Sequence, residues 1–228
     1  MKSIKKIAGA CAIAAFFVAG SAAAGPITLD FEGIAEFSAI ADYYNGGTAS
    51  DGSRGPNYGI SFSPDSIVLI DSDAGGGGTI GGMPSGVAVA TFFDGGAAIM
   101  NVAAGFDTRL AFHYAAGEPA FVNVFDDLGG TGNLLASLDL GVNVAHCMDG
   151  NNLFCQFSLV ELLFSGTARS VVFGGPNAWL TVDDVTIGVV DGEPPAEVPE
   201  PASLALAALG LAGLAAARRS AGRAGKRR

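Results

Sequence analysis

Between residues 25 and 190, the sequence consists of short runs of β-branched and aromatic residues, each followed by a turn that contains Gly, Asn or Asp. Such runs predict strands, and the turns between them favour antiparallel connections. Glycine is frequent, with 34 of 228 residues, but it follows no collagen-like period. This region has no recognisable amphipathic helix. We therefore predict an all-β fold, an antiparallel β-sandwich with a jelly-roll-like arrangement, over residues 25–190.

Eleven segments have the composition of strands. They are residues 27–31, 59–62, 67–70, 87–93, 98–102, 108–114, 120–125, 134–140, 157–164, 170–173 and 179–187. In 108–114, Leu110, Phe112 and Tyr114 alternate with polar or small residues, so we expect these three to be buried and His113 to face solvent. Trp179, which begins the last segment, is an aromatic candidate for sugar binding, but we expect it in the core.

The charge of this region excludes some classes of function. All 22 acidic residues lie between Asp30 and Glu200, where the basic residues are Arg54, Arg109 and Arg169. Such a surface repels nucleic acids and anionic polymers, so we expect no nucleic-acid partner. It remains soluble and attracts cations.

The N-terminus has the three parts of a secretory signal peptide, predicted over residues 1–24 as a short helix. Lys2, Lys5 and Lys6 precede an apolar run, and small residues before Gly25 form a cleavage site. We expect signal peptidase and the secretion machinery to handle this segment. Cys11 lies within it and leaves with it.

The C-terminus follows a linker rich in Pro and Glu, residues 191–198. It contains the motif Pro199, Glu200 and Pro201, an apolar run over 202–217, and Arg218 and Arg219. A helix of that run is about 24 Å long, short of the ~30 Å hydrocarbon core of a bilayer. We expect this short transmembrane helix to contact the inner membrane transiently, with the basic residues, including the tail 222–228, on the cytoplasmic side.

This order of features resembles the PEP-CTERM sorting signal, here over residues 199–221. The resemblance implies that an exosortase recognises the Pro-Glu-Pro motif and removes the helix. It also implies export to the cell surface or the extracellular matrix, in bacteria that make exopolysaccharide. A plain, retained membrane anchor is the alternative.

Two cysteines remain after removal of the leader. Cys147 and Cys155 enclose a short polar loop in an exported chain, which predicts a disulfide. A metal pair with His146 is the alternative, with fewer ligands than such sites usually have.

The first and last predicted strands both carry acidic residues. Leu29-Asp-Phe-Glu-Gly33 and Leu180-Thr-Val-Asp-Asp-Val-Thr-Ile187 are similar to the terminal strands of jelly-roll carbohydrate-binding modules. The resemblance implies that these strands lie side by side. It also implies a structural Ca²⁺ held by the acidic side chains at both ends, namely Asp30, Glu32, Asp183 and Asp184. Alternatively, these acids cap strand ends or face water.

Tyr43, Tyr44 and Tyr58 lie in Gly-rich connections and are candidates for stacking on sugar rings. Alternatively, they pack at the ends of the sandwich. We expect no enzyme and name no catalytic residue, because no Gly-x-Ser-x-Gly or His-Glu-x-x-His motif occurs and the predicted mature domain has no Lys. An acidic glycan hydrolase is the less favoured reading, since no carboxylate pair stands out.

The sequence thus favours an exported, non-catalytic surface or matrix protein associated with exopolysaccharide. The alternative is a self-associating, Ca²⁺-dependent structural or adhesive protein without a glycan ligand.

Overall fold

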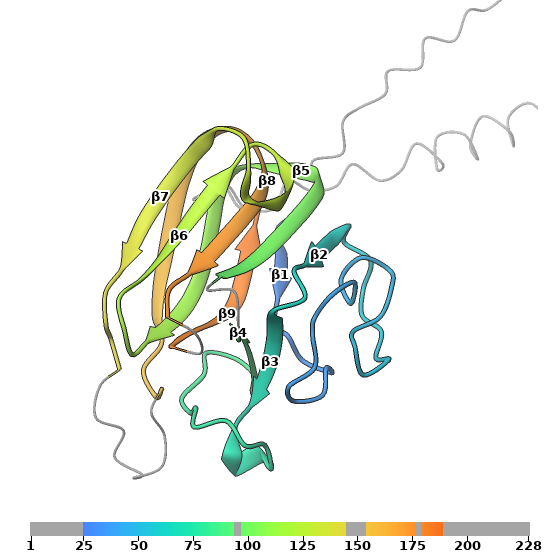
Figure 1. Cartoon of the computed structure of the whole chain (residues 1–228), viewed down its shortest axis with the longest axis vertical. Helices are drawn as coiled ribbons and strands as arrows, with labels where there is room; N and C mark the ends of the chain where they lie inside the picture. The colour runs from blue at the N-terminus through green and yellow to red at the C-terminus, as the bar shows by residue number, and fades with distance from the viewer. Residues whose placement is uncertain (1–24, 94–96, 145–153, 177–178, 189–228) are drawn as a thin grey trace, which may run out of the picture. The chain divides into compact units, whose positions relative to one another are not determined.

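A computed structural model of the chain describes residues 25–93, 97–144, 154–176 and 179–188, all within one compact unit, Ala24–Pro194 (Figure 1). The predicted signal helix, the sorting motif with its apolar helix and the basic tail lie outside these residues. In the part that the structure describes, no helix has the length and hydrophobicity needed to cross a membrane.

The described residues form nine strands and two short 3-10 turns. The strands are β1 (Ile27–Leu29), β2 (Ile60–Phe62), β3 (Ser66–Ile70), β4 (Ala88–Phe92), β5 (Ala97–Ala116), β6 (Ala120–Phe125), β7 (Leu134–Leu140), β8 (Ser158–Gly174) and β9 (Leu180–Ile187), and the turns are η1 (Ser72–Ala74) and η2 (Leu128–Gly130). All pairs of these strands are antiparallel, in the order β3-β4-β9-β5-β8-β6-β7, with β1 on β9 and β2 on β5. The predicted all-β, antiparallel class is confirmed.

The prediction of eleven separate strands was wrong at two places, because β5 and β8 each join two predicted segments into one long strand (Figure 1). β5 loses its register with β8 between Asn101 and Phe106, where Gly105 has a φ of 78°. β8 bends at Gly166, whose φ is 94°. Glycine adopts these left-handed angles without the steric cost of a Cβ, so each strand turns a corner without ending.

The two bent strands fold the sheet over a shared core. The first part of β5 pairs with β2 and the end of β8, and the second part pairs with β9 and the beginning of β8. Phe112 and Phe173, from the two parts of the folded sheet, meet edge to face with ring centroids 5.2 Å apart. Leu110, Phe112 and Tyr114 are buried as predicted. This arrangement is consistent with a β-sandwich.

The terminal strands lie side by side, as the resemblance to carbohydrate-binding modules implied. Ile27 is opposite Ile187 and Leu29 is opposite Val185. Between these pairs, the hydroxyl oxygens of Thr28 and Thr186 are 2.8 Å apart, within hydrogen-bonding distance. The segment that follows β1 therefore lies next to β9, and this places the acidic residues of both ends in one region.

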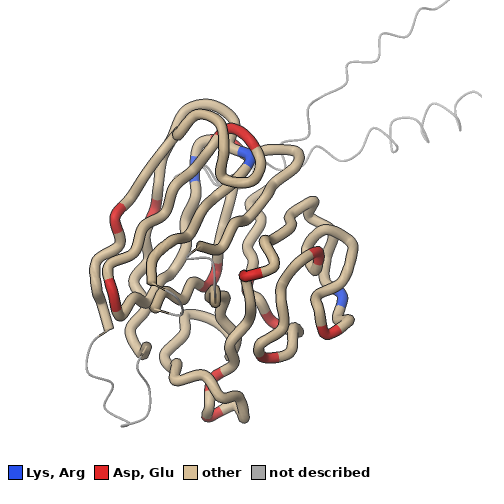
Figure 2. The backbone as a smooth tube through the Cα atoms, in the orientation of Figure 1, with Lys and Arg blue, Asp and Glu red and all other residues tan. Residues whose placement is uncertain are grey.

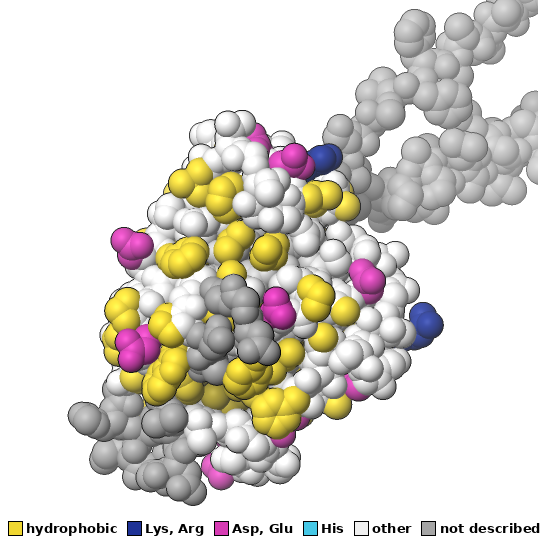
Figure 3. Space-filling model, in the orientation of Figure 1, with side chains coloured by type: hydrophobic (Ala, Val, Ile, Leu, Met, Phe, Trp, Pro, Cys, Tyr) yellow, Lys and Arg dark blue, Asp and Glu magenta, His cyan; other side chains and the backbone are white. Residues whose placement is uncertain are grey.

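Acidic residues are distributed around the domain, whereas basic residues are few (Figure 2). Among the described residues the basic side chains are Arg54, Arg109 and Arg169. Arg109 makes a two-pronged ion pair with Glu161, with Nη2–Oε2 and Nε–Oε1 distances of 2.7 Å. On the face shown in Figure 3, exposed hydrophobic side chains lie among Asp and Glu side chains.

Candidate functional site

Two of the three tyrosines that the sequence offered for sugar stacking are buried. Tyr43 is 8% exposed and Tyr44 is 2% exposed. The hydroxyl group of Tyr44 accepts a hydrogen bond from the Phe31 N–H (2.8 Å) and donates one to Asp30 Oδ1 (3.4 Å). Burial, followed by the nearby Asp30 charge, raises the pKa of Tyr44 above its ordinary value. These contacts make Tyr44 a core residue that secures the 31–59 segment to β1.

Tyr43 has a similar structural role, because its hydroxyl group donates a hydrogen bond to the Glu32 carbonyl oxygen (2.9 Å). Tyr58 is 41% exposed, and its ring lies nearly parallel to that of Tyr44, with centroids 6.2 Å apart. Tyr58 is therefore the one member of the predicted trio with a substantial ring surface available to a ligand.

A different set of aromatic side chains surrounds a hollow of about 300 Å³. We call it the aromatic hollow. It is lined by Phe37, Leu69, Gly77, Gly78, Thr79, Ile80, Phe93, Phe154 and Trp179. The side chains of Phe37, Phe93 and Trp179 are 57%, 37% and 40% exposed. The prediction that Trp179 is a core residue was wrong, because the residue precedes β9 and its ring borders the hollow.

The exposed rings are held in pairs by different segments. Phe37 comes from the β1–β2 connection and Phe93 follows β4, and their centroids are 6.4 Å apart. Phe154 and Trp179 form the second pair at 6.1 Å. Gly117 fits under the Trp179 ring, because a Cβ there would overlap the indole. The hollow thus combines aromatic rings from loops with Leu69 of β3 and with residues of the β3–β4 connection.

Backbone strain accompanies the most exposed of these rings. Phe37 has a φ of 58°, a left-handed angle that bulky residues rarely adopt. The Phe37 N–H donates to the Val68 carbonyl oxygen (2.8 Å), which fixes this conformation against β3. Strain of this kind is frequent at binding sites. The result is an aromatic ring directed outward at a site where burial would otherwise be favourable.

The hollow also has polar groups at its border. Thr79 is exposed, and Gly77 and Gly78 contribute peptide groups to the lining. Glu36 accepts the Gly77 N–H at 2.7 Å and thereby orders this segment. A hollow with aromatic rings and a few fixed polar groups is suited to flat, partly apolar ligands with hydroxyl groups.

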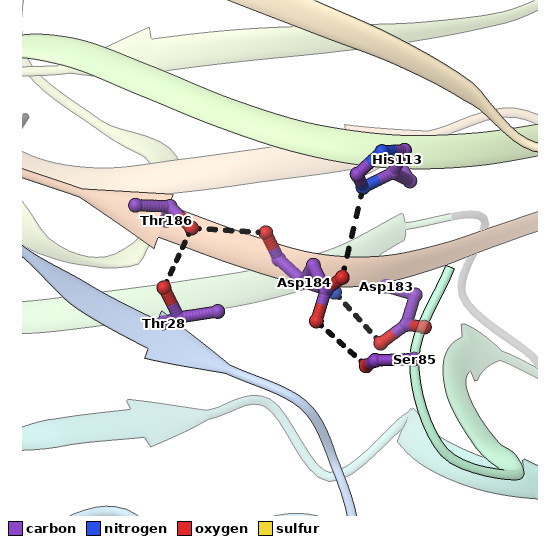
Figure 4. Close-up of polar contacts among 6 residues, drawn as sticks. All are labelled: Thr28, Ser85, His113, Asp183, Asp184 and Thr186. Atoms are coloured by element: carbon purple, nitrogen blue, oxygen red, sulfur yellow. Dashed lines mark hydrogen bonds and ion pairs between the residues drawn. The ribbon is translucent and has the colours of Figure 1, made fainter. Parts of the chain in front are cut away.

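A second polar cluster occupies the region where β1, the start of β4 and β9 meet (Figure 4). Asp183 is fully buried, its Oδ1 accepts a hydrogen bond from the Asp184 N–H at 2.7 Å, and its Oδ2 has no hydrogen-bond partner among the described residues. Burial, together with the charges of Asp184 and Glu32, raises the pKa of Asp183 to about 7. The Asp183 carboxyl group is therefore costly to ionise in this environment.

The other acidic side chains of this cluster, Asp184 and Glu32, interact with neighbouring residues. Asp184, which has a φ of 50°, accepts a hydrogen bond from Ser85 Oγ (2.7 Å). His113 Nδ1 lies 3.8 Å from Asp184 Oδ2, so this His faces a carboxylate and not only solvent, contrary to the prediction. Glu32 Oε1 accepts the N–H groups of Val87 and Ala88 at 2.7 and 2.8 Å.

The predicted calcium ligands are thus brought partly together. Glu32 acts electrostatically on Asp183, while Asp30 is directed toward the Tyr44 hydroxyl group. In the described part of the chain, no three or more His, Cys, Asp or Glu side chains converge in a way that would hold a metal ion. The calcium site remains a prediction.

The predicted disulfide cannot be placed, because Cys147 lies outside the described residues, as does His146. The sorting residues Pro199, Glu200, Pro201, Arg218 and Arg219 lie outside them as well.

The geometry defines an all-β domain with an aromatic hollow on its surface and an acidic cluster where β1, the start of β4 and β9 meet. Residues 197–220 match the model of the PEP-CTERM protein-sorting motif. The chain therefore carries this sorting signal, which indicates exosortase processing, export, and a surface or extracellular location. No curated protein matches the sequence.

Solved structures with similar arrangements are distant in sequence. The K2 cleaved adhesin domain of Lys-gingipain is 12% identical, with a TM-score of 0.42, over 72% of this chain and 98% of that one. A carbohydrate-binding module of Cellvibrio mixtus lichenase 5A, in complex with cellotriose, is 10% identical, with a TM-score of 0.34, over 55% and 88%. A family 29 carbohydrate-binding module from Piromyces equi is 12% identical, with a TM-score of 0.34, over 57% and 80%.

Proposed function

We propose that the protein is an exported, non-catalytic surface or matrix module that binds glycan chains, including the exopolysaccharide of its own cell, at the aromatic hollow. One observation carries the proposal: three exposed aromatic side chains, Phe37, Phe93 and Trp179, surround a hollow of about 300 Å³. Large apolar side chains are normally buried, and a group of exposed ones marks a surface for a ligand.

The polar border and the charge of the domain restrict the class of glycan. Thr79 and the neighbouring peptide groups can form hydrogen bonds with sugar hydroxyl groups, while the rings stack on the apolar faces of pyranoses. The excess of acidic residues disfavours polyanions. We therefore expect neutral polysaccharides to bind better than sulfated or uronic-acid polymers. The sorting signal supports this proposal, because it directs the domain to where such polymers lie.

Alanine substitutions in the hollow provide the test. Trp179→Ala and Phe37→Ala each remove one stacking surface, and we expect each to weaken glycan binding about threefold to tenfold. A glycan array would identify a neutral glycan, and titration calorimetry would then measure its Kd for each variant. The full chain, purified in mild detergent, is the sample.

Tyr58→Ala is the matched comparison, since Tyr58 is about as exposed as Trp179 but does not line the hollow. It should leave the Kd unchanged. If Tyr58→Ala alone abolished binding, the glycan site would be at Tyr58, as the sequence predicted, and not at the aromatic hollow. The absence of any glycan binding by the wild type would reject the proposed function.

Calcium is a separate proposal for the acidic cluster, supported by the buried Asp183 Oδ2 that lacks a partner. An ion there would take oxygens from Asp183 and Asp184, together with backbone carbonyl groups, and would reduce the repulsion between the two carboxylates. We expect millimolar Ca²⁺ to raise the Tm of the wild type, and Asp184→Asn to reduce that rise. A Tm that is the same in Ca²⁺ and in EDTA would remove the site.

A further inference from the structure

One edge of β8 is open along its first half. Residues 158–163 of β8 pair with β5 on one side, whereas β6 pairs only with residues 170–174 of β8. Among the described residues, no strand pairs with the second side of residues 158–165. We call this segment the β8 edge. Its free backbone N–H and C=O groups form a template on which another strand can be added.

The β8 edge lacks the residue types that most often protect an exposed strand. Its sequence, Ser158-Leu-Val-Glu-Leu-Leu-Phe-Ser165, has no Lys, Pro or Gly. Leu159 is 60% exposed and Leu163 is 70% exposed, on the same side of the strand. Between them lies Glu161, also exposed. Natural edge strands are commonly protected by Lys, Pro or bulges, and an apolar edge without them favours association.

Other open edges are less suited to association. β7 ends the sheet beyond β6, but its exposed residues include Ser137 and Asp139, and within the described ranges Asp139 has no ion-pair partner. β3 ends the sheet on the other side, and the segment around Phe37 to Ile40 covers it with backbone hydrogen bonds to Val68 and Ser66. The β8 edge therefore combines free backbone groups with exposed apolar side chains.

We infer that the β8 edge pairs antiparallel with the β8 edge of a second copy of this chain, around a two-fold axis at Glu161. In this register, Leu159 of each copy lies opposite Leu163 of the other, so all four exposed leucines become cross-strand pairs. Val160 lies opposite Leu162 on the other face of the strands, the face turned to the core. The sheet then runs continuously from β5 through both β8 strands to β5 of the second copy.

The charges on this edge favour a second copy of the chain as the partner. An acidic domain repels its own copies, but the Arg109 guanidinium binds the Glu161 carboxylate in two places and neutralises the one acid at the centre of the edge. The two Glu161 side chains that meet on the axis are thus each compensated within their own copy. The sorting signal delivers every copy to one surface, which raises the local concentration.

Analytical ultracentrifugation of the full chain in mild detergent tests the pairing. The wild type should form a dimer whose fraction rises with protein concentration. Added salt should strengthen the dimer, because it screens the repulsion between acidic domains. Leu163→Lys should weaken the dimer at least about tenfold, since the symmetric interface contains each changed side chain twice. EDTA should have no effect, which separates this pairing from calcium bridging.

Leu134→Lys is the matched control, because Leu134 is an exposed leucine, at 55%, on the other open edge, β7. It should leave the dimer intact, and circular dichroism should show both variants folded. In a second measurement, Glu161→Cys should give a disulfide-linked dimer on mild oxidation, whereas Val142→Cys should not. A wild type that is monomeric at every concentration, or equal effects of Leu163→Lys and Leu134→Lys, would overturn the inference. Glycan binding by Leu163→Lys should be unchanged, so the two proposals can fail separately.

Discussion

Asp183 is a fully buried carboxyl group whose pKa is raised to about 7 from 3.8. The pKa of Asp183 is higher in the folded state than in the unfolded state. Between these two pKa values, Asp183 is therefore protonated in the folded protein but ionised in the unfolded chain. The resulting stabilisation is fully present below about pH 4 and is lost as the pH rises through 7. In EDTA, we expect the free energy of unfolding to fall from pH 5 to pH 8, with Asp183 contributing on the order of 2–3 kcal/mol.

Asp183→Asn should flatten this part of the pH profile, since the amide keeps the oxygen that accepts the Asp184 N–H but cannot ionise. Chemical denaturation at each pH measures it. Asp139→Asn, which removes an exposed carboxylate on β7, should keep the wild-type slope. Parallel profiles for wild type and Asp183→Asn would show that Asp183 does not titrate in this range.

The residues of the site were only partly predictable. Aromatic type and a Gly-rich neighbourhood pointed to Tyr43 and Tyr44, but both are buried because their hydroxyl groups find partners near β1. The sequence did not single out Phe37 and Phe93. Whether a Phe is buried or exposed depends on where the fold places its strand or loop, which the local sequence does not show. The left-handed φ of Phe37 is a property of the fold and not of its local sequence.

At the level of elements, the sequence was most informative around the connection between β6 and β7. The strands at 120–125 and 134–140 were predicted with the bounds that the structure has. Their connection is closed by Asp126, whose carboxylate accepts the N–H (2.6 Å) and the side-chain amide (2.8 Å) of Asn133. The lengths of β5 and β8 were missed because Gly105 and Gly166 look like turn residues, whereas both strands continue beyond a bend.

The predicted Cys147–Cys155 bridge would close the connection between β7 and β8. If it forms, reduction frees a loop of about nine residues, and the chain-entropy model gives a loss of roughly 2–3 kcal/mol. We expect reductant to lower the Tm of the wild type but not that of a Cys147→Ser/Cys155→Ser variant. A thiol assay that finds both cysteines free in the native protein would contradict the bridge.

For the whole molecule, the sorting motif at residues 197–220 makes the exported product measurable. We expect mass spectrometry of the exported protein to show a start near Gly25 and an end near Pro199, because signal peptidase and exosortase would remove the two ends. Glu200→Ala should reduce processing at the C-terminal site. A product in the medium that retains Arg228 would argue against sorting by this route.

The pairing of β1 with β9 has a mechanical consequence. Ile27 and Ile187, the outer ends of the two strands, are opposite each other, so a force that pulls the chain ends apart acts on this pair first. Such a load opens the antiparallel ladder one residue pair at a time, like a zipper, and does not shear all pairs together. Single-molecule pulling should therefore register detachment of the three-residue β1 at low force before the remaining sheet resists.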